Sequence, residues 1–143
     1  MIKERESNGL YRLLYVSRSS NGMVDAAVTA RDIADGSEPT NRANGVTGAL
    51  VAHASWFIQA LEGPHEAVTS IYAKIAKDPR HRDLQVISVE PIEARLFPRW
   101  GMRAGRMQPT DLEPMFDASK MTEATLLGLL KLAVFGFAKP RAA

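Results

Sequence analysis

The chain has 143 residues, of which 45% are hydrophobic and 24% charged, as is typical of a globular protein rather than a disordered or fibrous one. Its length fits one domain with a helical appendage and leaves no room for a second catalytic domain. The net charge is only +2 and the basic residues are scattered, which argues against nucleic acid as a partner. The lack of cysteine excludes disulfides, thiolate metal sites, cysteine nucleophiles and cysteinyl photoadducts.

The N-terminal part of the chain predicts one strand followed by one helix. Residues 1–9 are charged and polar and lack the apolar segment of a signal peptide, so we expect a cytoplasmic location. Residues 10–17 are rich in apolar and aromatic side chains and predict a first strand. Apolar residues at helical spacing predict a helix over residues 23–33, which we expect Gly36 and Pro39 to end.

The next segment predicts a β-hairpin with an amide inside it. Two apolar runs, residues 46–53 and 56–62, are separated by a small turn. The second run is apolar on both faces, so we expect a central strand that is covered on two sides. Gln59 lies in its middle. A buried primary amide without hydrogen bonds costs about 1–3 kcal/mol, so Gln59 needs a structural partner or a ligand.

The following elements complete a recognisable order. Pro64 suits a helix start, and apolar residues recur at i, i+3, i+4 and i+7 from Val68 to Ile75. Strands are predicted over residues 84–89 and 95–102. The order β-α-β-β-α-β with an additional strand predicts an α+β, ferredoxin-like sandwich. Its first and third strands are central neighbours, which would bring Tyr15 and Gln59 side by side on one face.

The C-terminal part predicts helices that cover the other face of the sheet. Residues 111–116 predict a short helical turn, and Thr122 is a candidate N-cap for a last helix that ends near Phe135. The longest apolar stretch, residues 126–138, is interrupted by glycine and lysine and is shorter than the roughly 20 residues that span a bilayer. We therefore expect no membrane association, and a helix buried against the sheet or in a homo-oligomer.

Five ordered motifs carry a family resemblance. They are Leu13-Leu14-Tyr15-Val16-Ser17; Asn41 with Gly45-Val46-Thr47-Gly48; Phe57-Ile58-Gln59 with Leu61-Glu62-Gly63; Asp78-Pro79-Arg80-His81; and Arg95-Leu96-Phe97 with Trp100-Gly101-Met102. In this order they resemble the BLUF family, sensors of blue light using flavin. The resemblance implies FAD, with FMN or riboflavin as alternatives, held between the two helices. It divides the chain into an N-terminal extension (1–9), a flavin-binding domain (10–102) and a C-terminal helical extension (103–143).

The resemblance also implies roles for three polar residues. Tyr15 matches the electron and proton donor to the excited flavin. Gln59 matches the amide between this tyrosine and the flavin N5/O4 edge, where its hydrogen bonds rearrange. Asn41 matches the amide that anchors the pyrimidine edge of the ring. Without the resemblance, Tyr15 reads as a core tyrosine bonded to a backbone carbonyl, and Gln59 as an amide tied to the backbone.

Four further residues match cofactor-binding or signalling positions. Arg80 and His81 match residues near the ribityl and phosphate end, where a guanidinium can grip phosphate bidentately. The alternatives are a solvated charge for Arg80 and a helix-end residue for His81, and no spacing supports a metal site. Trp100 and Met102 match last-strand residues that can exchange between pocket and surface as the signal leaves, Met102 also lining the cofactor site. The alternative is two apolar residues on a half-buried strand.

The sequence thus predicts a blue-light photoreceptor that is not an enzyme. Light drives transfer of an electron and a proton from Tyr15 and rearrangement at Gln59, and the last strand and C-terminal helices signal to an unidentified partner protein. The alternative is a light-independent flavin-binding protein or a small flavin oxidoreductase. The sequence gives this alternative little support, because it contains no Gly-rich dinucleotide motif, no nucleophile-base arrangement and no paired carboxylates. Glu62 alone makes a poor acid-base site.

Overall fold

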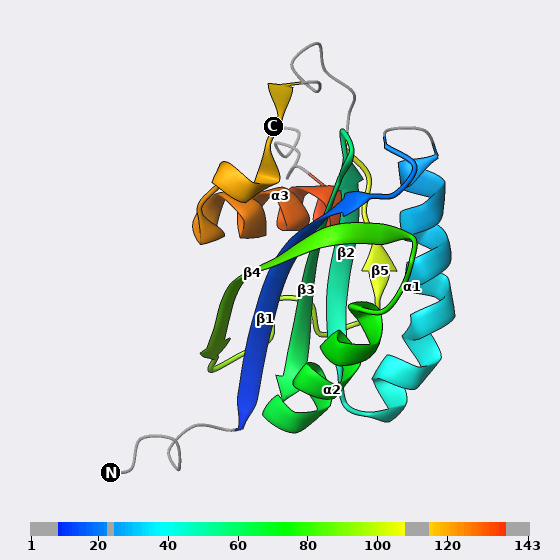
Figure 1. The fold of residues 1–143 in the computed structure, drawn as a ribbon. Coiled ribbons are helices and arrows are strands. Elements are labelled where there is room, and N and C mark those ends of the chain that lie inside the picture. Colours follow the sequence, from blue (N-terminus) through cyan, green and yellow to red (C-terminus); the bar gives the residue numbers. More distant parts are fainter. Residues whose placement is uncertain (1–8, 23–24, 108–114, 137–143) are drawn as a thin grey trace, which may run out of the picture.

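A five-stranded sheet with helices on both faces forms the structure, a computed structural model that describes residues 9–22, 25–107 and 115–136 (Figure 1). The elements, in chain order, are β1 (Leu10–Ser19), α1 (Ala26–Ala43), β2 (Thr47–His53), β3 (Trp56–Pro64), α2 (His65–Ile75), β4 (His81–Pro91), β5 (Arg103–Ala104), the 3-10 turn η3 (Ala118–Lys120) and α3 (Glu123–Phe135). Strand order is β4-β1-β3-β2-β5, with β5 parallel to β2 and the other pairs antiparallel. The predicted α+β, ferredoxin-like arrangement with an additional strand is confirmed.

The pairing of β1 with β3 brings the two key polar residues together. Tyr15 lies directly opposite Gln59 in the antiparallel register, as the predicted topology requires. Every residue of β3 except Pro64 is buried, which confirms a central strand covered on both faces. Because side chains alternate along a strand, Tyr15 and Gln59 share the face on which α1 and α2 lie.

Two apolar cores lie on opposite faces of the sheet. Leu13, Phe57 and Leu61 pack with residues of α1 and α2 on one face. Leu14, Val16 and Ile58 alternate onto the other face, where they pack with Leu126 and Leu130 of α3. Both α3 leucines are fully buried. The prediction that a C-terminal helix covers the second face is therefore confirmed for α3 (Figure 1).

The predicted end of the first helix is wrong. α1 continues through Gly36 and Pro39 to Ala43. Its buried positions, Ala26, Ala30, Ala34 and Asn41, continue the same side of the helix past both residues. Packing of this side against the sheet outweighs the low helix propensity of glycine and proline. As a result Asn41 lies in the last turn of a helix and not in a loop.

The predicted strand over residues 95–102 is also wrong, because only Arg103–Ala104 pairs with β2. One backbone hydrogen bond, from Gly48 of β2 to the carbonyl of Trp100, joins the preceding segment to the sheet, and side chains satisfy other backbone groups of this segment. The N–H groups of Leu96 and Phe97 donate to the Glu62 carboxylate at 3.0 and 2.9 Å. Glu62 is thus a structural carboxylate, and Trp100 and Met102 lie just before a short strand rather than on a long one.

The remaining predicted elements differ less. α2 begins after Pro64, and β1 and β4 are longer than predicted. The predicted N-cap of the last helix is confirmed, since the Thr122 hydroxyl accepts the N–H of Thr125 at 3.1 Å. The predicted turn at residues 111–116 lies almost wholly outside the described residues, as does the N-terminal extension up to residue 8. No helix in the described ranges is long and apolar enough to span a membrane.

Candidate functional site

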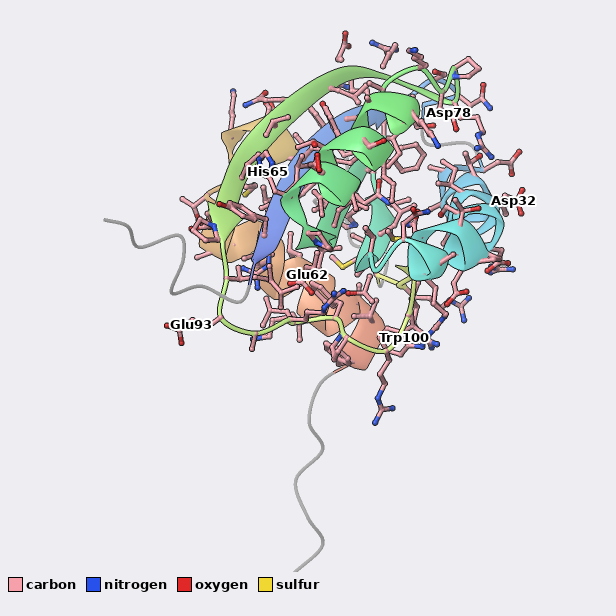
Figure 2. All side chains as sticks on the ribbon, turned by 90° about the horizontal axis from the view of Figure 1, so that it is seen from below. Asp32, Glu62, His65, Asp78, Glu93 and Trp100 are labelled. Carbon is pink, nitrogen blue, oxygen red and sulfur yellow. The ribbon has the colours of Figure 1, made fainter. Side chains whose placement is uncertain are left out.

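A cavity of about 330 Å³ lies between α1 and α2, above the sheet. Its lining residues are Asp32, Ile33, Gly36 and Ser37 from α1, Gln59 from β3, Lys74 and Ile75 from α2, and Asp78 and Arg80 from the following loop. Figure 2 shows Asp32 and Asp78 at the same edge of the molecule, although 46 positions separate them. Isoleucines thus line the two helical walls, an amide lies on the sheet floor and charged groups surround the opening.

Gln59 is held between a phenol and a thioether. The Tyr15 hydroxyl donates a hydrogen bond to Oε1 of Gln59, and Nε2 of Gln59 donates to Sδ of Met102 at 3.3 Å. The three residues are 2%, 1% and 3% exposed. The amide therefore has the polar partner that its burial requires, and it has only a weak acceptor, the thioether, on its other side.

The environment of Tyr15 keeps its phenol protonated. Burial raises the pKa of Tyr15 far above its usual range, and the charges of Tyr72 and Asp78 raise it further. The Tyr72 ring meets the Tyr15 ring edge-on at a centroid distance of 5.3 Å. A buried phenolate is therefore unfavourable here, and loss of the proton alone is disfavoured.

Arg80 lies at the opening of the cavity, but its charge is already paired. Its guanidinium contacts the Asp78 carboxylate at 2.6 Å, and the hydrogen bonds from Arg80 lower the pKa of Asp78. Lys74 and Asp32 also line this end. Two cationic and two anionic side chains therefore balance at the opening, which suits a hydroxyl-rich group better than an isolated phosphate.

His81 is buried and is not among the residues that line the cavity. Its Nε2 is 2.8 Å from the carbonyl oxygen of Ile75, and its Nδ1 is 2.8 Å from the Ser17 hydroxyl. A carbonyl only accepts, so Nε2 carries a proton and donates to Ile75, while Nδ1 is paired with the Ser17 hydroxyl. His81 thereby joins the end of α2 to β1, and a direct contact with a cofactor stays a prediction.

Asn41 and Trp100 connect the segment before β5 to two helices, Asn41 to α1 and Trp100 to α3. Asn41 is 2% exposed, and its Nδ2 donates to the carbonyl of Gly101 at 2.9 Å. Trp100 packs on Phe135 of α3 with a centroid distance of 5.8 Å, and the Arg103 guanidinium lies 4.7 Å above its ring. Met102 therefore points inward to Gln59, whereas Trp100 packs against α3.

The α1 wall of the cavity was missed from the sequence because the helix was predicted to end too early. Ile33, Gly36 and Ser37 are spaced i, i+3, i+4 on one side of α1, but only Ile33 contributes to an apolar periodic pattern. A Cβ at Gly36 would meet no atom within 4 Å, so this position faces open space. Glycine inside a helix costs about 1 kcal/mol of helix stability relative to alanine. Here its lack of a side chain leaves more space in the cavity.

The fold and the site define a ferredoxin-like ligand-binding domain whose cavity ends at a buried tyrosine-glutamine pair. The family described as sensors of blue-light using FAD matches residues 10–103. The chain belongs to this family, BLUF, and the predicted blue-light-sensing domain that uses a flavin is confirmed.

Curated relatives match this chain over 62–76% of its length. The photoactivated adenylate cyclase subunit beta of Euglena gracilis is 31% identical over 109 residues, which are 76% of this chain and 13% of that protein. Subunit alpha from the same organism is 36% identical over 90 residues, 62% of this chain and 8% of that protein. The chain thus spans a small part of the length of these relatives.

Solved structures of similar proteins extend the comparison. The dark-state structure of BlrB, a BLUF protein, is 35% identical, with a TM-score of 0.60 over 67% of this chain and 71% of that chain. The photo-activated state of BlsA is 26% identical, with a TM-score of 0.73 over 94% of this chain and 99% of that chain. The similarity to BlsA therefore includes residues beyond the family match, which ends at residue 103.

Proposed function

We propose that this chain is a cytoplasmic blue-light photoreceptor, without catalytic activity of its own, in which Gln59 is the switch and FAD the chromophore. The observation that carries the proposal is the pair of hydrogen bonds from Tyr15 to Gln59 Oε1 and from Gln59 Nε2 to Met102, on the floor of the α1–α2 cavity. The cavity volume of about 330 Å³ and its isoleucine walls fit a planar ring system. The bound flavin would supply blue-light absorption and, once excited, a strong oxidant.

After excitation, Tyr15 and Gln59 act one after the other. Tyr15 gives up an electron and its phenolic proton together, because its raised pKa disfavours loss of the proton alone. Oε1 of Gln59 thereby loses its hydrogen-bond donor, while Nε2 faces only the weak thioether acceptor of Met102. The amide is therefore free to rearrange. When the electron and the proton return to Tyr15, the phenol forms again beside the rearranged amide, and the starting hydrogen bonds from Tyr15 to Oε1 and from Nε2 to Met102 are restored only in darkness.

We propose that the signal leaves through Met102, Trp100 and α3. Met102 directly precedes β5, and Trp100 packs on Phe135 of α3. The next link is Gly105, where a Cβ would lie only 2.6 Å from Cβ of Ala133, so that α3 packs tightly on this segment. Phe135 is 51% exposed, which supports an interface of α3 with a partner protein or with a second copy in a homo-oligomer.

Absorption spectra of the flavin-loaded protein before and after blue illumination test this proposal. We expect a small red shift in the wild type that reverses in darkness. Gln59→Leu should retain flavin and lose the shift, and Tyr15→Phe should lose it as well. The matched control is Gln85→Leu, which changes an exposed amide on β4 and should leave the shift intact.

Several results would contradict the proposal. A wild-type shift in Gln59→Leu would show that this amide is not the switch. Flavin bound without any shift in the wild type would favour a light-independent flavoprotein, and oxidation of a nicotinamide cofactor in darkness would favour an oxidoreductase. Extraction of the flavin and measurement of its mass would distinguish FAD from FMN and riboflavin.

A further inference from the structure

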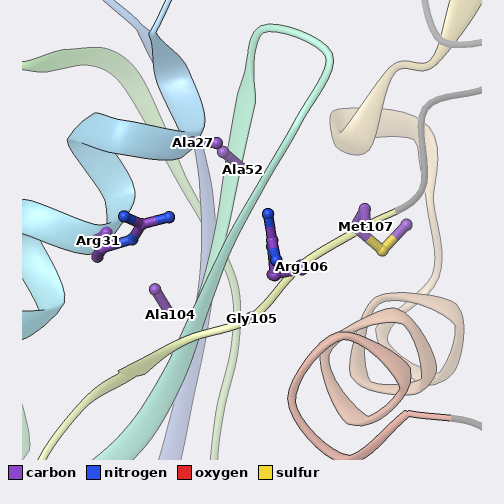
Figure 3. Close-up of a pocket in the computed structure, with 7 residues that line it drawn as sticks. All are labelled: Ala27, Arg31, Ala52, Ala104, Gly105, Arg106 and Met107. Atoms are coloured by element: carbon purple, nitrogen blue, oxygen red, sulfur yellow. The ribbon is translucent and has the colours of Figure 1, made fainter.

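A second cavity, of about 490 Å³, lies between α1 and the edge of the sheet formed by β2 and β5 (Figure 3). Its lining residues are Ala27 and Arg31 from α1, Ala52 from β2, Ala104 from β5, and Gly105, Arg106 and Met107 from the segment that follows. None of them lines the cavity between α1 and α2. The two cavities are therefore distinct.

Two arginines, one from α1 and one from the segment after β5, give this second cavity its charge. Figure 3 shows Arg31 reaching from α1 toward β2, and Arg106 rising from the segment after β5. Within the described ranges, neither guanidinium makes a hydrogen bond or an ion pair, and no carboxylate lines the cavity. At the first cavity, by contrast, cationic and anionic side chains balance. The second cavity thus carries uncompensated positive charge.

We propose that this second cavity binds a small phosphate-bearing ligand of the nucleotide class. A guanidinium presents a planar fork of N–H donors that matches phosphate oxygens bidentately, and here two such forks come from different elements. The volume of about 490 Å³ exceeds what a phosphate needs and lies in the range of small-molecule sites.

The rest of the lining suits the base of such a ligand. Ala27, Ala52 and Ala104 are small and apolar, and Met107 has a flexible, polarisable side chain that adapts to flat rings. The backbone N–H groups of Gly105 and Arg106 already donate to Leu50 and Ala133. Anion binding therefore depends on the two guanidinium groups, which makes it sensitive to single substitutions.

The position of the cavity also couples it to the light switch, an inference that rests on the proposed function. Its lining segment begins at Ala104, two residues after Met102, which contacts Gln59. A ligand that contacts this segment binds with different affinity if light changes the position of Met102. Because linkage is reciprocal, the ligand then also shifts the balance between the dark and lit states.

Calorimetric titration of the flavin-loaded protein in darkness, with AMP and with inorganic pyrophosphate as probes, tests the site without any photochemistry. We expect saturable binding at one site, weakened by added salt as screening requires. Arg31→Gln and Arg106→Gln should each weaken binding by about tenfold, since each removes a charge-assisted contact. Ala27→Glu, which adds a carboxylate to the lining, should also weaken it.

The matched control is Arg82→Gln. This arginine on β4 is exposed, pairs with Asp83 at 2.6 Å and does not line the cavity, so its removal changes the net charge equally and should leave the affinity unchanged. Absence of binding to the wild type, or an equal loss in Arg82→Gln, would overturn the site. Probe binding to riboflavin-loaded but not to FAD-loaded protein would overturn it too, because the cavity would then serve the phosphates of the chromophore.

The same titration under continuous blue light tests the coupling. A reproducible change in affinity on illumination supports it, and equal affinities in the dark and in the light would overturn the coupling. A wild-type protein that binds AMP in darkness but shows no spectral shift would count against the proposed photochemistry and not against this site.

Discussion

Replacement of Glu62 by glutamine tests how the segment that carries Trp100 and Met102 is held. Glu62 is fully buried, and its carboxylate accepts hydrogen bonds from Arg12 Nε at 2.8 Å and from the N–H groups of Leu96 and Phe97. Glu62→Gln preserves the size of the side chain. It removes the negative charge and replaces one of the two accepting oxygens with an N–H₂ donor, so one of these donors loses its acceptor.

The expected loss of stability follows from these contacts. Breaking a buried ion pair by removing one partner costs about 3–5 kcal/mol, because the other charge stays buried without a counter-ion. Glu90 lies opposite Arg12 in the β1–β4 register and offers it a second carboxylate, which places Glu62→Gln near the lower limit, about 3 kcal/mol. With a denaturant dependence of about 1–3 kcal/mol per molar urea, the unfolding midpoint should fall by about 1–3 M.

Urea unfolding followed by circular dichroism measures this loss. The matched control is Glu66→Gln, at an exposed position of α2, which should change the free energy of unfolding by less than about 0.5 kcal/mol. The double variant Arg12→Met, Glu62→Gln should be less destabilised than the sum of the two single variants, because the uncompensated charge is gone. A loss below about 1 kcal/mol in Glu62→Gln would refute the reasoning.

Two further predictions concern the two faces of the sheet. Because the pKa of Tyr15 is raised in the folded protein, only the unfolded chain loses this proton above about pH 10, and the free energy of unfolding should fall with rising pH by at most about 1.4 kcal/mol per pH unit. Urea unfolding at several pH values should show a steeper fall for the wild type than for Tyr15→Phe. Parallel curves for the two proteins would contradict this prediction. Leu126→Ala, at a fully buried position of α3, should cost about 2–5 kcal/mol. Leu132→Ala, 37% exposed, should cost much less, and equal losses in the same assay would show that α3 is not anchored as described.

The central pairing could be predicted because it depends on local patterns and a common topology. Alternation in β3 placed Gln59 on a buried face, and the order of the elements made β1 its neighbour, so that Tyr15 and Gln59 were expected side by side. The capping threonine of α3 is likewise a local signal, since Thr122 and Thr125 are three residues apart. In each case the prediction depends on a pattern within one short segment, either the alternation of side chains along a strand or the three-residue spacing of a helix cap.

The errors have the opposite origin. α1 passes through Gly36 and Pro39 because its alanine side packs on the sheet, a tertiary effect that outweighs local propensity. Residues 95–102 were expected to pair as a strand, yet the acceptor for Leu96 and Phe97 is Glu62, 34 and 35 positions away. The second cavity could not be predicted either, since Arg31 and Arg106 converge only when β5 pairs with β2.

The irregular backbone before β5 also has a mechanical consequence. A long strand at this edge would be fixed by a continuous ladder of hydrogen bonds, whereas here β5 has only two paired residues, Arg103 and Ala104. The segment before them is held by the side chains of Glu62, Glu38 and Asn41 and by one backbone hydrogen bond, from Gly48 of β2 to the carbonyl of Trp100. Under the proposed mechanism, displacing Met102 would disturb few backbone hydrogen bonds, and the movement would pass to the segment that contacts both α3 and the arginine-lined cavity. A segment that is anchored at its start and weakly paired at its end is suited to carry a rearrangement of one amide to the surface.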